Sequence, residues 1–132
     1  MNILVTGGAG FIGSHICRRL LSDGHAVTLI DDFNDYYDPA IKRGNVAALG
    51  GAAKVVEGDI RDRGQIQQLF AEGKFETVIH IAARAGVRPS VKDPQLYIDT
   101  NITGTHHLLE ASRQNAVKRF IFASSSSVYG LA

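Results

Sequence analysis

The 132-residue sequence predicts an α/β fold: a doubly wound sheet of about five parallel strands in the order 3-2-1-4-5, with helices on both faces. Short apolar runs alternate with longer segments of helical periodicity, which is typical of βαβ units. The runs are almost continuously apolar, as expected for strands that are covered on both faces. A glycine-rich turn follows the first run, and because crossover connections are right-handed, few other strand orders are possible.

The predicted strands are β-branched or aromatic runs at residues 3–5, 26–30, 54–57, 77–81 and 119–123. Between the first two, Ile12, Ile16 and Leu20 recur every four residues and form one apolar stripe of a helix. That helix is expected to end near Gly24, because glycine commonly terminates helices.

Three further helices are expected. Residues 40–49 contain a possible short helix in the least regular part of the chain. Asp62 is a suitable N-cap for a helix that carries Ile66, Leu69 and Phe70. A longer helix begins near Pro94, a favoured residue of the first turn, and has on one side Ile98, Ile102, Thr105 and Leu109.

The composition excludes several classes of protein. Because 14 Lys and Arg residues nearly balance 13 Asp and Glu residues, no large basic face for nucleic acid is expected. No apolar run approaches the roughly 20 residues of a membrane helix. The one cysteine, Cys17, is expected to be buried, and no side chains have the spacing of a metal site. We therefore expect a single cytoplasmic domain without a metal ion, a nucleic-acid partner or a membrane segment.

The turn at residues 6–13, TGGAGFIG, has the spacing of a dinucleotide-binding loop. Gly7 would permit the tight turn, Gly10 would let a pyrophosphate approach the backbone, and Gly13 would let the helix pack closely on the sheet. The N–H groups of Phe11 and Ile12 would then face the phosphates at the positive end of the helix dipole. A strand before this turn and a helix after it provide the context that the motif requires.

Two carboxylates, Asp31 and Asp32, follow the second strand. An acidic residue about 20 positions after the glycines can accept hydrogen bonds from the adenosine ribose and repel a 2′-phosphate. Asp31 is the preferred candidate by position. No Lys or Arg follows until Lys42, so nothing in the sequence compensates a 2′-phosphate, and NAD is favoured over NADP.

Taken together, the motifs resemble the extended short-chain dehydrogenases/reductases of the nucleotide-sugar epimerase/dehydratase family, whose cofactor domain has a Rossmann-type fold. The matching segments, in family order, are residues 6–13, 31–34, 58–62, 80–83, 101–105 and 124–130. Residues 35–39 and 82–90 are most similar to UDP-glucuronate 4-epimerases, which act on sugar C4 by hydride transfer.

The resemblance implies further cofactor contacts. Asp59 and Ile60 would hold the adenine, and the matching 31–34 segment adds Asn34 to the acidic pair. On the nicotinamide side the resemblance implies Ala82, Ala83 and Arg84. Asn101 would steady the backbone near the active site.

The resemblance also implies a substrate side. Ser125 matches the family's catalytic Ser/Thr, and Ser126 stands beside it, although a polar loop leaving a strand explains Ser126 equally well. Ser126 and Ser127 occupy the place of the acidic pair of the 4,6-dehydratases, which argues against dehydration. Arg88 is a candidate for a substrate carboxylate or phosphate, with a solvated loop arginine as the alternative.

The family's catalytic Tyr-x-x-x-Lys pair is absent from these residues. Lysine is not found four positions after any of Tyr36, Tyr37 or Tyr97, and the chain has no such position after Tyr129. We therefore expect residues 1–132 to be a NAD-binding domain without the later strands and the C-terminal substrate domain, inactive alone and able to self-associate through an exposed sheet edge. An active epimerase/dehydratase and a nucleotide-sensing module are the alternatives.

Overall fold

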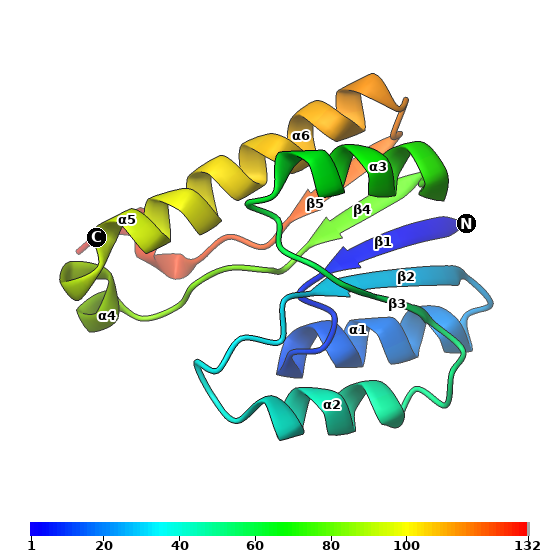
Figure 1. Cartoon of the computed structure of the whole chain (residues 1–132), viewed down its shortest axis with the longest axis horizontal. Coiled ribbons are helices and arrows are strands. Elements are labelled where there is room, and N and C mark those ends of the chain that lie inside the picture. The colour runs from blue at the N-terminus through cyan, green and yellow to red at the C-terminus, as the bar shows by residue number, and fades with distance from the viewer. Residues whose placement is uncertain (132) are drawn as a thin grey trace.

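Five parallel strands form one sheet in a computed structural model that describes residues 1–131 (Figure 1). The order is β3-β2-β1-β4-β5, which confirms the predicted order and fold class. The strands are β1 (Asn2–Thr6), β2 (Ala26–Asp31), β3 (Lys54–Glu57), β4 (Thr77–His80) and β5 (Arg119–Phe122). The carboxyl ends of β1 and β4 meet at the centre of the sheet, where the strand order reverses and where open α/β sheets bind their ligands.

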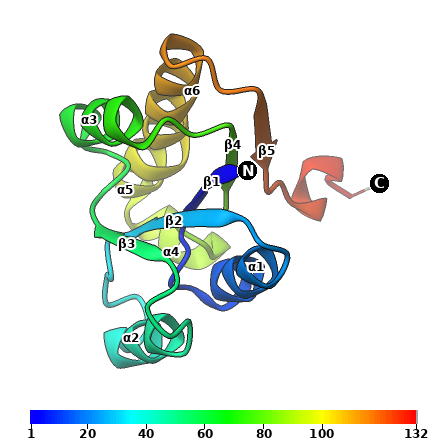
Figure 2. The ribbon, with the colours of Figure 1, turned by 90° about the vertical axis from the view of Figure 1, so that its right-hand side faces the viewer.

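Helices cover both faces of the sheet. They are α1 (Phe11–Ser22), α2 (Pro39–Ala47), α3 (Arg63–Gly73), α4 (Val87–Lys92), α5 (Pro94–Tyr97) and α6 (Gly104–Gln114), with a π-helix η1 (Ile98–Thr103) and a 3₁₀-helix η2 (Ser126–Tyr129). Helices α1 and α2 lie on one face, and α3 and α6 lie on the other (Figure 2). The expected cap of α3 is present, because the Asp62 carboxylate accepts the N–H of Gln65 at 3.1 Å. None of the helices within residues 1–131 is long and apolar enough to span a membrane.

Two cores result from the alternation of side chains along the strands. Ile3 and Val5 of β1 pack with Cys17 of α1, whereas Leu4 packs with Phe70 of α3 and Leu108 of α6. Cys17 is fully buried, as expected, and burial raises the pKa of its thiol to about 11. The doubly wound arrangement thus follows directly from apolar residues at consecutive strand positions.

The long helix packs differently from the sequence pattern. Ile98, Ile102 and Leu109 are 44%, 65% and 47% exposed, so these three residues of the predicted side do not face the sheet. The fourth, Thr105, does contact the sheet through His80 of β4. The buried side has the small residues Gly104 and Ala111. A Cβ at position 104 would lie 2.7 Å from the Ile60 side chain, so glycine here lets the helix approach Ile60 closely. The π-helix η1 between α5 and α6 also shifts the phase of the helical repeat, which a 3.6-residue pattern does not anticipate.

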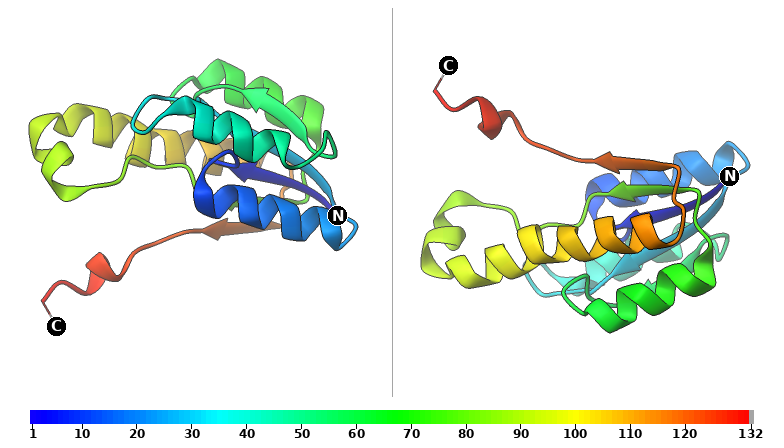
Figure 3. Two further views of the ribbon diagram at one scale, coloured as in Figure 1. Left: turned by 90° about the horizontal axis from the view of Figure 1, so that it is seen from below. Right: turned by 90° about the horizontal axis from the view of Figure 1, so that it is seen from above.

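The edge strand β5 leaves apolar surface uncovered. Ile121 and Phe122 are 51% and 54% exposed. The chain after β5 extends away from the sheet and ends in η2, apart from the other helices (Figure 3). The exposed edge that the sequence predicts is present in the described residues.

A buried hydrogen-bond chain joins β1, β4 and the long helix through His80, which is 3% exposed. Its Nδ1 lies 2.6 Å from Thr6 Oγ1, and its Nε2 lies 2.8 Å from Thr105 Oγ1. Since the Thr105 hydroxyl donates to the Asn101 carbonyl oxygen at 2.7 Å, the network assigns Nε2 as the protonated nitrogen of a neutral imidazole. Burial lowers the pKa of His80 to about 4, which agrees with that assignment.

We expect His80 to make stability depend on pH. Between an unfolded-state pKa of about 6.5 and the folded value, the unfolded chain binds a proton that the native chain does not, so stability falls as the pH decreases. Urea unfolding at pH 7.5 and pH 5 should show a loss of about 2 kcal/mol from this residue. His80→Gln should lack that share of the loss, whereas the exposed-site control His106→Gln should retain it. Equal pH dependence in the wild type and His80→Gln would contradict the assignment.

Candidate functional site

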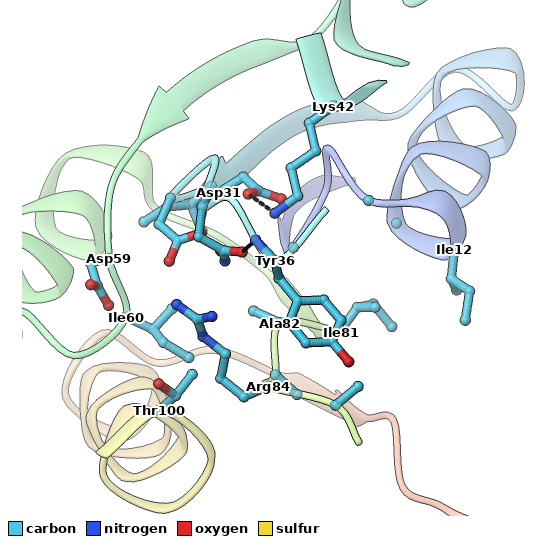
Figure 4. A pocket seen from close by; sticks show the side chains of 18 of the residues that line it. Ile12, Asp31, Tyr36, Lys42, Asp59, Ile60, Ile81, Ala82, Arg84 and Thr100 are labelled. Carbon is cyan, nitrogen blue, oxygen red and sulfur yellow. Dashed lines mark hydrogen bonds and ion pairs between the residues drawn. The ribbon is translucent and has the colours of Figure 1, made fainter. Parts of the chain in front are cut away.

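A pocket of about 400 Å³ opens at the carboxyl ends of the central strands. Its walls come from the turn between β1 and α1, the end of β2 and the segments that follow β3 and β4 (Figure 4). The structure brings to this pocket every predicted cofactor residue except Asn101: Gly7, Gly10, Phe11, Ile12, Gly13, Asp31, Asp32, Asn34, Asp59, Ile60, Ala82, Ala83 and Arg84. The topology therefore collects residues from four separate motifs around one cavity.

The glycine turn is shaped by close backbone contacts. Gly7 has a φ of +69°, a conformation that glycine adopts without strain. A Cβ at position 13 would lie 2.1 Å from the Gly7 carbonyl oxygen, so the first turn of α1 packs directly on the loop. Gly10 is the N-cap of α1, and no side chain caps the helix. The first N–H groups of α1 can therefore serve an anionic ligand.

Asp31 is held at the end of β2 by several donors. Its Oδ1 accepts the N–H of Phe33 at 2.9 Å, and its Oδ2 accepts the N–H of Ala9 in the glycine turn at 3.2 Å. The ammonium group of Lys42, from α2, lies 3.3 Å from Oδ1. The carboxylate thus links the glycine turn, β2 and α2, and it stays in contact with the pocket.

The structure corrects one step of the sequence argument for NAD. The sequence shows no nearby cation to balance the charge of a 2′-phosphate, because Lys42 lies 11 positions after Asp31. The packing of α2 nevertheless brings the Lys42 ammonium group into direct contact with the Asp31 carboxylate. The described part of the pocket therefore contains a cation at this end, and the carboxylate of Asp31 neutralises it.

Asp32 and Asp59 complete the acidic side of the pocket. Asp32 Oδ1 accepts from both the backbone and side-chain nitrogens of Asn34, at 3.1 and 2.7 Å. Arg61 forms a bidentate ion pair with Asp59, and the shortest contact, between Arg61 Nη2 and Asp59 Oδ2, is 2.6 Å. Burial works to raise the pKa of Asp59, but the hydrogen bonds and charge of Arg61 and the charge of Arg84 lower it overall. The Asp59 carboxylate is therefore an ionised acceptor.

The segment after β4 is fastened to the long helix. Asn101 Oδ1 accepts the N–H of Arg84 at 2.8 Å, and Asn101 Nδ2 donates to the Arg84 carbonyl oxygen at 3.0 Å. The Tyr97 hydroxyl donates to the carbonyl oxygen of Ala85 at 2.7 Å. Asn101 lies in η1 and lines no part of the pocket, so it acts by positioning the loop whose Arg84 side chain extends toward Ile60 and Thr100 (Figure 4).

The three residues predicted for the substrate side also lie outside the pocket. Ser125 and Ser126 are exposed where the chain leaves the sheet, and the Ser125 hydroxyl accepts the N–H of Ser127 at 3.1 Å as the N-cap of η2. Arg88 is exposed on the short helix α4. The structure brings none of them together with the cofactor residues.

Sequence reasoning missed Tyr36, Tyr37 and Lys42, which also line the pocket. Tyr36 crosses toward the segment after β4, where a Cβ on Gly86 would lie 3.1 Å from its hydroxyl. The two tyrosines belong to a motif that carried the family resemblance, so the motif itself was the available signal. No sequence signal pointed to Lys42, because its place beside the pocket depends on how α2 packs. No group of three or more His, Cys, Asp or Glu side chains in residues 1–131 could hold a metal ion.

Comparisons with known proteins identify the same family. Residues 3–132 match the NAD dependent epimerase/dehydratase family. UDP-glucuronate 4-epimerase 3 of Arabidopsis thaliana is 46% identical over 98% of this chain and 31% of its own length. Protein CapI of Staphylococcus aureus is 40% identical, over 98% of this chain and 39% of its own. The chain thus spans between about a third and two fifths of these relatives.

Solved structures agree with this similarity. A UDP-glucose 4-epimerase from Stenotrophomonas maltophila, with bound NAD and formylated UDP-arabinopyranose, superposes with a TM-score of 0.86 at 41% identity, covering 98% of this chain and 38% of that one. A Thermus thermophilus UDP-glucose 4-epimerase in complex with NAD gives a TM-score of 0.84 at 40% identity, covering 95% of this chain and 38% of that one.

We expect Asn101→Asp to weaken the clamp on Arg84, by which we mean the two hydrogen bonds between the Asn101 side chain and the Arg84 backbone. The carboxylate can still accept the Arg84 N–H, but it places an acceptor against the carbonyl oxygen where Nδ2 now donates. Loss of that partly buried bond should lower the free energy of unfolding by about 1–3 kcal/mol in urea titrations. Gln67→Glu, the same amide-to-acid change at an exposed position of α3, is the control and should have little effect. A variant as stable as the wild type would show that the clamp does not hold the loop.

Proposed function

Because the chain belongs to the NAD dependent epimerase/dehydratase family, we propose that its pocket binds NAD and that residues 1–132 are the cofactor-binding domain of a nucleotide-sugar 4-epimerase. One observation carries the proposal. An uncapped helix N-terminus behind a glycine turn and the Asp31 carboxylate lie in one pocket, and the Ala9 N–H joins them by donating to Asp31. Such a pocket offers donors to a pyrophosphate and an acceptor to a ribose.

The pocket residues fit the parts of a dinucleotide. The N–H groups of Phe11 and Ile12 would hold the pyrophosphate, and Asp31 would accept from the adenosine ribose. Asp59 and Ile60 would hold the adenine. The backbone of Ala82 and Ala83 and the Arg84 side chain would line the nicotinamide side, on a loop that Asn101 fastens. Bound NAD supplies a reversible acceptor for a hydride.

For the substrate we propose a UDP-sugar, with UDP-glucuronate first and UDP-glucose or UDP-galactose second. The support is the similarity to UDP-glucuronate 4-epimerase 3 and the UDP-glucose 4-epimerase structures. Ser125 would hydrogen-bond the reacting hydroxyl, and Ser126 and Arg88 would contact the sugar nucleotide. All three are exposed, so their side chains are accessible to a ligand outside the cofactor pocket.

Calorimetric titration with NAD tests the proposal, and a substitution of Gly10 is the most informative variant. Gly10 has a φ of −74°, which any residue adopts, and a Cβ there would meet only the Gly7 carbonyl oxygen at 3.3 Å and the Tyr37 hydroxyl at 3.7 Å. Gly10→Leu should therefore fold, yet its side chain would occupy the phosphate position. We expect NAD affinity to fall at least tenfold, a loss of about 1.4 kcal/mol or more.

Gly44→Leu is the matched control, since nothing lies within 4 Å of a Cβ at that position of α2. It should bind NAD like the wild type. No NAD binding by the wild type at millimolar concentration, or unchanged affinity in Gly10→Leu, would contradict the proposed site. We also propose that residues 1–132 by themselves show no 4-epimerase turnover with UDP-glucuronate, because these residues contain no Tyr-x-x-x-Lys pair.

We also propose that this polypeptide self-associates through β5. The strand is at the edge of the sheet, and Ile121 and Phe122 are about half exposed, a combination that favours pairing between chains. Sedimentation at micromolar concentration should show dimers or larger species. Ile121→Lys should shift them toward the monomer, whereas Lys118→Arg, an exposed conservative change, should not. A stable wild-type monomer would overturn this expectation.

A further inference from the structure

Lys42 is an unusual residue to find buried beside a binding pocket. Its side chain is 8% exposed, and that of its partner Asp31 is 5% exposed. Lysine is almost never buried without a partner, because removing its charge from water is costly. The pair is also part of the pocket wall (Figure 4). An ion pair that only stabilised the fold would not have to border the pocket.

The surroundings of Lys42 provide one opposite charge. Asp31 Oδ1 is 3.3 Å from the ammonium nitrogen, and the Tyr37 ring centroid is 5.3 Å from it. The neighbouring cation, Arg43, is occupied elsewhere. Its guanidinium pairs with Glu57 at 3.0 Å and stacks 3.9 Å over the Phe33 ring. Lys42 is therefore the cation that directly contacts Asp31 in the described residues.

We propose that Lys42 and Asp31 together determine the choice between NAD and NADP. In this proposal Lys42 could bind a 2′-phosphate, but the carboxylate of Asp31 neutralises its charge. This inference rests on the proposed function, in which Asp31 faces the adenosine ribose. It assigns Lys42 as a specificity-determining residue.

The charges of the pair account for a preference for NAD. A ribose hydroxyl can donate to the Asp31 carboxylate and accept from the Lys42 ammonium, so the pair complements both properties of a hydroxyl group. A 2′-phosphate has only acceptors and a charge of about −2, and Asp31 repels it. With Asp31 present, the charge of Lys42 is already balanced.

Removal of the Asp31 charge changes that balance. The ammonium group would remain buried, now without an anion, and a phosphate would restore the lost ion pair. Charge-assisted hydrogen bonds are roughly twice as strong as neutral ones, so the unpaired lysine should favour NADP strongly over NAD. The sequence distance between Asp31 and Lys42 hides this coupling, because α2 is needed to bring the two side chains together.

The experiment is a double-mutant cycle read by calorimetric affinity for NAD and for NADP. The variants are Asp31→Asn, Lys42→Met and the combination of both. In the wild type we expect NAD to bind more tightly. In Asp31→Asn the ratio of NADP to NAD affinity should rise about 10- to 100-fold. The double variant should lose that gain, and Lys42→Met alone should reject NADP more strongly than the wild type.

Arg43→Met is the matched control. It removes a neighbouring cation of the same helix, and the affinity ratio should stay at the wild-type value. Asp31→Ser is the second neutral variant, in case an amide opposite the Ala9 N–H impairs folding. Thermal unfolding gives an independent readout, since NADP should raise the Tm of either neutral variant more than NAD does at equal concentration.

The outcomes separate this inference from the proposed function. If the wild type binds neither dinucleotide, the proposed function fails. If the wild type binds NAD but Asp31→Asn and the double variant have the same affinity ratio, Lys42 is only a structural anchor for α2 and this inference is overturned. A rise of the NADP-to-NAD affinity ratio in Asp31→Asn that disappears in the double variant supports it.

Discussion

The contact between Gly13 and the carbonyl oxygen of Gly7 is the constraint on which the site depends. Because a Cβ at position 13 would lie 2.1 Å from that oxygen, the first turn of α1 rests on the loop that precedes it. This approach places the helix N-terminus beside the end of β1, in the wall of the pocket. The remaining parts of the pocket are then arranged around it: Thr6 Oγ1, at the end of β1, accepts the N–H groups of Ile81 and Ala82 at 3.0 and 3.1 Å.

The same threonine begins a hydrogen-bond chain that reaches the far side of the pocket. Thr6, His80 and Thr105 connect the central strands to the long helix, where Asn101 holds both backbone groups of Arg84. A neutral imidazole is essential to this chain, since it accepts at one nitrogen and donates at the other. The loop that would line the nicotinamide side is thus positioned by a chain of buried and partly buried polar groups. The acidic side is positioned by carboxylates that accept backbone N–H groups.

The charges in the pocket divide it into two functional ends. The first residues of α1 line one part of the pocket with the N–H groups of a helix N-terminus, and Asp31, Asp32 and Asp59, which would lie toward the ribose and adenine of the proposed ligand, also line it. Two cations partly balance the negative charge of these carboxylates. Lys42 pairs with Asp31, and the charge of Arg84 helps to lower the pKa of Asp59. A dinucleotide with free ribose hydroxyls matches such a distribution better than one with an added phosphate. The family membership and the similarity to UDP-sugar epimerases agree with this chemistry.

The sequence by itself determined the fold class and the strand order, because these depend on local patterns, and its motifs and family resemblance named many of the residues that line the pocket. Continuous apolar runs specify buried strands, and the glycine spacing and the Asp31 position specify a turn and a strand end. Only the tertiary structure decided three matters that depend on packing between distant segments. It turned Ile98 and Ile102 outward through the π-helix and the small residues of α6. It left Ser125 outside the pocket. It also brought Lys42 to Asp31, since the charge next to a carboxylate is set by distance in space, which the path of α2 controls.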